Sequence, residues 1–183
     1  RGGGAGRPSI AVMTRAVLLT GPLGSGKTSV ALEVGELLGS AGVPHAVIDL
    51  DWLCWAGPGL TGAALDAVLV DNLAAVRARY EAAGITTLVL ARTVSSLAQV
   101  EAIRSAAGGA LVALRLSVPH HERRARLAAR DGAGAAADLL EDADLADADA
   151  RLPLPALRNH ARPSRETAAE VIARLGWLGH ARA

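Results

Sequence analysis

Residues 16–28 read Ala-Val-Leu-Leu-Thr-Gly-Pro-Leu-Gly-Ser-Gly-Lys-Thr. The first five form a short apolar run that stops at a glycine, as expected of a strand buried on both faces of a parallel sheet. The remainder fits Gly-x-x-x-x-Gly-Lys-Thr, the Walker A pattern of a loop that holds a nucleoside triphosphate. Glycines let successive backbone N–H groups converge on phosphate oxygens, and the positive end of the following helix adds to the attraction. We therefore predict a phosphate-binding loop over 21–28.

Individual side chains of this loop have expected tasks. We predict that Lys27 contacts the β- and γ-phosphates of ATP and that the Thr28 hydroxyl ligates Mg²⁺. Lysine and arginine together number 19, and Lys27 is the single lysine, so the other 18 are arginines. A compact, flexible ammonium suits the phosphate position, although a glycine-rich turn with a solvated lysine is the alternative. The predicted nucleotide-binding residues are Gly21, Gly24, Ser25, Gly26, Lys27, Thr28 and Ser29.

Composition limits the class of protein. With 183 residues the chain is long enough for one domain, which we place at 13–183 after a Gly-rich extension over 1–12. A formal net charge of +1 disfavours general binding to nucleic acid or acidic membranes. No apolar run is long enough for a membrane span and no signal-peptide pattern opens the sequence, so we expect a cytoplasmic protein, monomeric or homodimeric. Cys54 is the only cysteine, which excludes an intramolecular disulfide.

Short apolar runs alternate with helical patterns along the chain. This alternation predicts an α/β fold with a parallel sheet covered by helices on both faces. Helix starts and stops follow from polar caps and glycines, with Ser164 as the N-cap of the last helix and Gly176 just beyond its end. A loop is expected over 52–62. The predicted strands span 16–20, 45–50, 86–91, 110–116 and 156–159, and the predicted helices span 28–40, 63–83, 96–106, 119–130, 136–151 and 164–175.

Two carboxylates follow the second predicted strand. Asp49 and Asp51 are spaced two apart, so that both side chains would point to one face near the phosphate loop. Asp49 is then a candidate to hold Mg²⁺ through water, and Asp51 to orient or deprotonate a substrate hydroxyl. Either acid could instead cap a helix or face solvent. The third strand ends at Arg92 without an acid, which argues against motor-type and GTPase-type ATPases.

Arginines crowd the predicted helix over 119–130. Arg126 and Arg130 lie one helical turn apart and could face a bound phosphate together. Cationic groups on a mobile cover stabilise the transferred phosphoryl group and exclude water, so we predict a lid over about 119–150. The alternative is a solvated basic face paired with neighbouring acids. Trp52 and Trp55, beside the acids, are expected to pack at the core or its rim rather than to stack on a planar substrate.

This layout resembles the small P-loop kinases, including shikimate kinase, gluconate kinase, adenylylsulfate kinase and chloramphenicol phosphotransferase. The resemblance runs from Met13 over nearly the whole chain and implies a five-stranded parallel sheet of order 2-3-1-4-5 with a small helical lid. It also implies that the acids after strand two serve substrate or metal and that lid arginines hold phosphates, roles that fall on Asp49, Asp51, Arg126 and Arg130. The segment at 48–53, Ile-Asp-Leu-Asp-Trp-Leu, and the Leu-Gly-Trp end at 175–177 resemble uncharacterised actinobacterial kinase-like P-loop proteins.

Two departures from these families concern the acceptor. The glycine-rich substrate loop that follows strand three in shikimate kinase is absent, and Arg92-Thr93-Val94 stands in its place. Adenylylsulfate kinase carries Asp-Gly-Asp-Asn after strand two, whereas this chain has Asp-Leu-Asp-Trp at 49–52.

The expected activity is transfer of the ATP γ-phosphate to a hydroxyl of a small-molecule acceptor, with Lys27, Asp51, Arg126 and Arg130 as the catalytic residues and with Thr28 and Asp49 at Mg²⁺. Two alternatives stay open. One is a nucleotide-binding regulatory protein in which the phosphates only set a conformation. The other is a nucleoside monophosphate kinase.

Overall fold

The computed structural model describes residues 14–56, 58–131 and 152–178. In chain order the elements are β1 (Arg15–Thr20), α1 (Lys27–Ser40), β2 (Ala46–Asp49), the 3₁₀ helix η1 (Leu50–Cys54), α2 (Gly62–Ala82), β3 (Thr87–Ala91), α3 (Leu97–Ala106), β4 (Ala110–Ser117), α4 (His120–Asp131), β5 (Ala156–Arg158) and α7 (Ser164–Leu175). The five strands form one parallel sheet in the order β2-β3-β1-β4-β5, which confirms the predicted fold class. None of the described helices has the length and hydropathy that a membrane-spanning segment requires.

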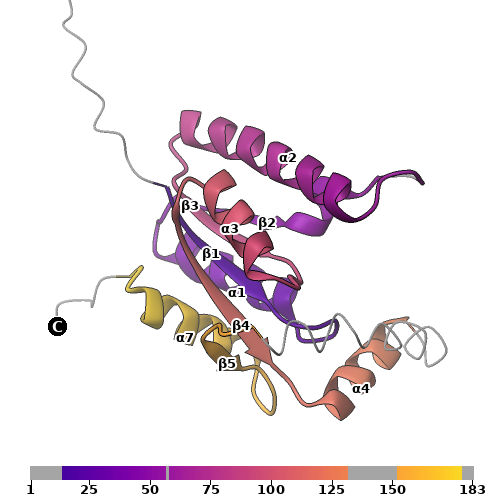
Figure 1. Cartoon of the computed structure of the whole chain (residues 1–183). Helices are drawn as coiled ribbons and strands as arrows, with labels where there is room; N and C mark the ends of the chain where they lie inside the picture. The colour runs from indigo at the N-terminus through magenta and orange to yellow at the C-terminus, as the bar shows by residue number, and fades with distance from the viewer. Residues whose placement is uncertain (1–13, 57, 132–151, 179–183) are drawn as a thin grey trace, which may run out of the picture.

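Helices cover the sheet on both faces, with α2 and α3 on one side and α1 and α7 on the other (Figure 1). The strands are apolar on both faces, so successive side chains enter different cores. In β1, Ala16 and Leu18 join the core beneath α2 and α3. Val17 and Leu19 join the core beneath α1 and α7. This double burial explains why the strands appear in the sequence as continuous apolar runs.

Several element boundaries differ from those predicted. His45 and Leu50 lie outside β2, and Leu50–Cys54 forms a 3₁₀ helix where we expected the start of a loop. The cap of α7 is Pro163, so Ser164 is the first helical residue instead of the N-cap. The predicted helix over 136–151 falls on residues outside the described part of the chain, as does most of the predicted lid.

The parallel arrangement brings five connections to one edge of the sheet. The phosphate loop follows β1, η1 follows β2, Arg92 follows β3, α4 follows β4 and Asn159 follows β5. Ligands in open α/β sheets bind in the crevice beyond the carboxyl ends of the strands. The fold therefore gathers the candidate functional residues at a single edge.

Candidate functional site

The phosphate loop runs from Gly21 to Gly26, and α1 begins at Lys27. Gly26 has φ +87°, and a Cβ atom there would lie 2.7 Å from Asn159 Nδ2. A side chain at this position would therefore meet both backbone strain and a buried neighbour. The first N–H groups of α1 have no acceptor within their own helix, which leaves them available to phosphate oxygens at its positive end.

Lys27 lies across the loop that precedes it. Its Nζ donates to the carbonyl oxygens of Gly21, at 2.9 Å, and Pro22, at 3.4 Å. The Gly21 carbonyl also accepts a hydrogen bond of 3.0 Å from the Thr93 hydroxyl, which ties the loop to the segment after β3. This position holds the ammonium over the loop, where a triphosphate would need it.

Thr28 and Asp49, the two residues predicted to hold Mg²⁺, are in contact. The Thr28 hydroxyl donates to Asp49 Oδ2 at 2.8 Å, joining the first turn of α1 to the end of β2. Mg²⁺ at nucleotide sites keeps several waters and is held by few protein ligands together with phosphate oxygens. A hydroxyl and a carboxylate in contact beside the phosphate loop fit this donor set.

Asp49 and Asp51 lie close together, but not through the alternation of side chains along a strand that we predicted. Asp51 belongs to η1 and not to the strand, so the two-residue periodicity of a strand does not place it. Asp49 caps η1, and its Oδ1 accepts a hydrogen bond of 3.2 Å from the Asp51 backbone N–H. The turn brings both side chains to the same cavity.

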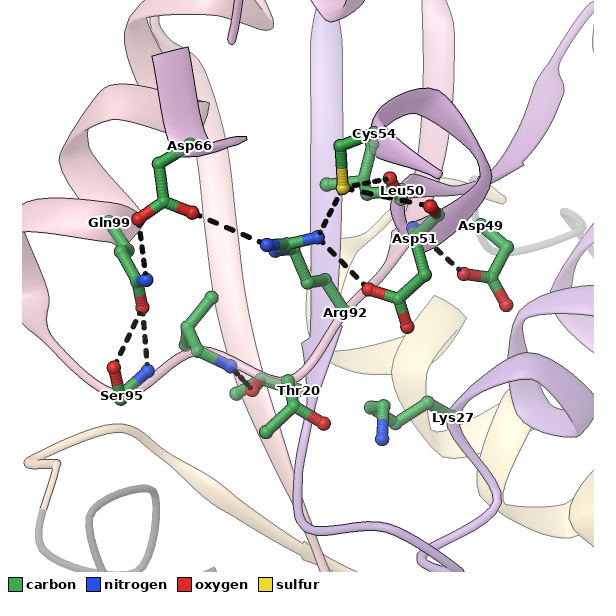
Figure 2. A network of polar contacts seen from close by, with 12 residues as sticks. Thr20, Lys27, Asp49, Leu50, Asp51, Cys54, Asp66, Arg92, Ser95 and Gln99 are labelled. Carbon is green, nitrogen blue, oxygen red and sulfur yellow. Dashed lines mark hydrogen bonds and ion pairs between the residues drawn. The ribbon is translucent and has the colours of Figure 1, made fainter. Parts of the chain in front are cut away.

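The Asp51 carboxylate faces Arg92, whose Nη1 lies 3.0 Å from Oδ1 (Figure 2). Burial among neighbouring protein atoms raises the pKa of Asp51 above its ordinary value, against the opposing effect of Arg92. Asp49 also raises this pKa, whereas Lys27 lowers it. The Asp51 side chain is 59% exposed, so the carboxylate is accessible from the cavity. Such a carboxylate has the position and the basicity to accept a hydroxyl proton.

Arg126 and Arg130 both project from α4 to the cavity beside the phosphate loop. Arg126 also donates from Nη2 to the Asn159 carbonyl oxygen at 2.9 Å and lies 3.6 Å from Glu122. Arg126 therefore fits both alternatives considered from the sequence, because it faces the site and also pairs with an acid on its own helix. Arg162, which the sequence did not single out, lines the same cavity.

These residues enclose one cavity of about 580 Å³. It brings together most of the predicted site, while Gly21 and the fully buried Ser25 lie in the loop behind it. The size is within the range of about 300–1,000 Å³ usual for small-molecule sites. The lining residues are Leu23, Gly24, Gly26, Lys27, Thr28, Ser29, Asp49, Asp51, Arg126, Leu127, Arg130, Arg162, Pro163 and Ser164.

Sequence patterns missed two residues that organise the site. Arg92 bridges Asp51 to Asp66 on α2, at 3.0 Å and 3.3 Å (Figure 2). Asn159, which is 2% exposed, donates from Nδ2 to the Ser25 carbonyl at 2.7 Å. Both directly follow strands, so their position at the ligand-binding edge is the one signal that could have identified them.

The two tryptophans of η1 and its C-terminal end do not pack into the core, contrary to our expectation. Trp52 and Trp55 are 70% and 77% exposed. Their rings stack on each other, with centroids 5.1 Å apart and planes inclined by 14°. Each ring therefore covers apolar surface of the other ring instead of packing against the core.

The sheet order and the helices on both faces give this chain the fold of the small P-loop kinases. No protein-family model matches the sequence, and neither does any curated protein. Among solved structures, the APS kinase CysC of Mycobacterium tuberculosis in complex with AMPPNP and APS is 26% identical, with a TM-score of 0.62. That match covers 89% of this chain and 98% of the other.

Two further structures extend the likeness in fold. The tunicamycin resistance protein of Deinococcus radiodurans is 20% identical with a TM-score of 0.62, and the match covers 89% of this chain and 96% of that protein. A sugar kinase from a Janibacter species is 22% identical with a TM-score of 0.63, over 88% and 94% of the two chains. Two of these three structures, the APS kinase and the sugar kinase, are thus kinases named for different acceptors.

Proposed function

We propose that this protein is a phosphotransferase that moves the γ-phosphoryl group of ATP to a hydroxyl of a small molecule. The observation that carries the proposal is one cavity lined by Lys27, Thr28, Asp49 and Asp51 together with arginines of α4. The first three fit the phosphate end of a nucleotide, whereas Asp51 fits an acceptor hydroxyl. Structural neighbours that act as kinases, one of them solved with AMPPNP, support this assignment.

The donor half of the site would bind ATP through backbone N–H groups of the loop and the Lys27 ammonium. Thr28 and Asp49, already in contact at 2.8 Å, are the residues that would hold Mg²⁺. A bound ion would supply positive charge that offsets part of the charge of the phosphates. Arg126 and Arg130 would add positive charge from the α4 side of the cavity.

In the proposed reaction the acceptor hydroxyl oxygen forms a bond to the γ-phosphorus. The bond from that phosphorus to the β–γ bridging oxygen breaks, and ADP leaves with the electron pair. The hydroxyl proton passes to a carboxylate oxygen of Asp51, whose raised pKa favours its acceptance. No residue of this chain becomes covalently modified.

The test is ADP formation from ATP with and without a pool of small-molecule metabolites. We expect acceptor-dependent turnover that falls by about 10²–10³-fold in Lys27→Ala, since that charge acts on the transition state. We expect a fall of about 10²–10⁴-fold in Asp51→Asn, which removes the base. Asp71→Asn, an exposed change on α2, is the matched control.

Two outcomes would contradict the proposal. Unchanged turnover in Lys27→Ala would exclude the loop as the donor site. Tight ATP binding without acceptor-dependent ADP formation would favour a regulatory nucleotide switch instead.

A further inference from the structure

A second cavity, of about 290 Å³, lies between α2 and α3. Arg92 lines it and contacts Asp51, which lines the phosphate cavity. Figure 2 shows this guanidinium between Asp66 on one side and Asp51 on the other, with Lys27 on the Asp51 side. The volume suits a small molecule better than a second nucleotide. The lining residues are Ala63, Asp66, Leu69, Val70, Arg92, Ser96, Ala98, Gln99, Ala102 and Ile103.

The Arg92 guanidinium already contacts other side chains of the protein. Nη1 lies 3.0 Å from Asp51 Oδ1 and 3.2 Å from Cys54 Sγ, and Nη2 lies 3.3 Å from Asp66 Oδ1. The Arg92 side chain is 12% exposed, so its charge is largely withdrawn from solvent. A guanidinium held by two carboxylates has its positive charge already balanced, so it attracts the carboxylate or phosphate of a ligand less than an unpaired one would.

Asp66 and Gln99 form the polar side of the cavity. Gln99 Nε2 donates to Asp66 Oδ2 at 2.9 Å, while Gln99 Oε1 accepts from the Ser95 backbone N–H at 2.7 Å. These bonds fix the orientation of the Gln99 amide. The other carboxylate oxygen of Asp66, Oδ1, accepts from Arg92. The polar groups are therefore held in place before any ligand binds.

One carboxylate and one guanidinium line this cavity, and they pair with each other. Asp66 and Arg92 are the only charged residues among those that line it in the described part of the chain. Arg92 is shared with Asp51, so two carboxylates oppose one guanidinium. An anionic ligand would meet the Asp66 carboxylate, while the Arg92 guanidinium is already shared by two carboxylates, and like charges placed together are unfavourable.

We propose that this cavity receives the body of the phosphoryl acceptor, and that the acceptor is an uncharged or cationic hydroxyl compound. The inference rests on the kinase function proposed above. The reacting hydroxyl lies at Asp51, and the rest of the molecule extends past Arg92 to Asp66 and Gln99, which determine specificity. The apolar wall formed by α2 and α3 covers the carbon skeleton.

The first experiment separates acceptors by charge. A bacterial metabolite extract is passed over an anion-exchange resin, and each fraction is incubated with the full chain, Mg²⁺ and ATP labelled at its γ-phosphate. We expect a new labelled product from the unretained fraction, which holds uncharged and cationic compounds. A product from the retained, anionic fraction would overturn the inference and leave the kinase function standing. No product from either fraction would contradict the kinase function itself.

The second experiment uses the purified acceptor to test the location of its site. Ala98→Trp adds bulk at an exposed position on the cavity wall. Asp66→Asn removes the carboxylate without changing its shape. We expect each variant to raise the acceptor KM by at least about 10-fold, in line with the loss of one packed or charge-assisted contact. The KM for ATP should stay unchanged.

Matched controls lie on the same helix as Asp66. Ala78→Trp and Asp71→Asn place the same changes at exposed positions of α2 outside the cavity. We expect both to keep the acceptor KM of the original chain. An unchanged acceptor KM in Ala98→Trp or Asp66→Asn would exclude the cavity between α2 and α3 as the acceptor site.

Discussion

The side-chain amide of Asn159 donates a hydrogen bond of 2.7 Å to the carbonyl oxygen of Ser25 and so joins the end of β5 to the phosphate loop. Asn159 Oδ1 accepts a bond of 2.7 Å from the buried Thr167 hydroxyl on α7. Its backbone carbonyl accepts from Arg126 on α4 at 2.9 Å. One buried residue therefore connects the loop, the arginine helix and the last helix.

The first prediction concerns this connection. Asn159→Ala should lower the free energy of unfolding by at least about 1–3 kcal/mol, because it leaves the Thr167 hydroxyl and the Ser25 carbonyl without their partner. Thermal unfolding with and without nucleotide measures the effect, and ATP affinity should also fall. Asn72→Ala, at an exposed asparagine bonded to the Leu53 carbonyl, is the control and should change ATP affinity little. Equal losses in both variants would contradict a special role for Asn159.

A second prediction separates backbone strain from steric conflict in the loop. Gly26 and Gly42 both have positive φ, +87° and +69°, but a Cβ atom meets Asn159 only at Gly26, whereas nothing lies within 4 Å at Gly42. Gly42→Ala should cost about 1–2 kcal/mol of stability from strain alone. Gly26→Ala should cost more and should also weaken ATP binding, measured by calorimetry. Comparable stability and intact binding in the two variants would exclude the conflict.

The third prediction tests the metal site. Asp49→Asn should raise the Mg²⁺ concentration needed for half-maximal turnover by about 10- to 100-fold, because the carboxylate orients Thr28 and attracts the ion. Binding of ATP without metal should change little. A Mg²⁺ titration of ADP formation measures the shift, with Asp71→Asn as the control. A titration curve identical to that of the original chain would remove Asp49 from the metal site.

The pH dependence of kcat/KM gives the fourth prediction. A general base must be ionised, so activity should be lost as the pH falls through an Asp51 pKa that lies above the ordinary aspartate value. Arg92 lowers this pKa, and Arg92→Met should therefore move the acid limb of the profile to higher pH. Arg79→Met, an exposed change on α2, should leave the limb in place. A shift to lower pH would contradict the assignment of Asp51.

The sequence was sufficient to predict the sheet, and it carries a local signal for a phosphate loop. Strand residues buried on both faces produce continuous apolar runs, and a phosphate loop needs its glycines, lysine and threonine at fixed spacing, so both leave local signals. The structure confirms the strand order 2-3-1-4-5 that the resemblance implied. The site roles assigned from that pattern stay predictions.

Arg92 and Asn159 left weaker signals because their contacts join distant parts of the chain. Arg92 and Asp66 are separated by 26 residues, and Asn159 and Ser25 by 134. Neither pair follows a spacing that a helix or strand would impose. The prediction that Trp52 and Trp55 pack at the core was also wrong. Each ring stacks on the other instead of on core residues, and both stay exposed.

The single lysine gives the protein one cleavage site for a lysine-specific protease, after Lys27. That bond lies in the first turn of α1, directly after the phosphate loop, so cutting requires local opening of the segment that would hold the nucleotide. Digestion would cut this sequence between Lys27 and Thr28, at a rate set by this opening. A ligand that closes the loop should slow the digestion, which turns the protein's unusual composition into a direct assay of occupancy.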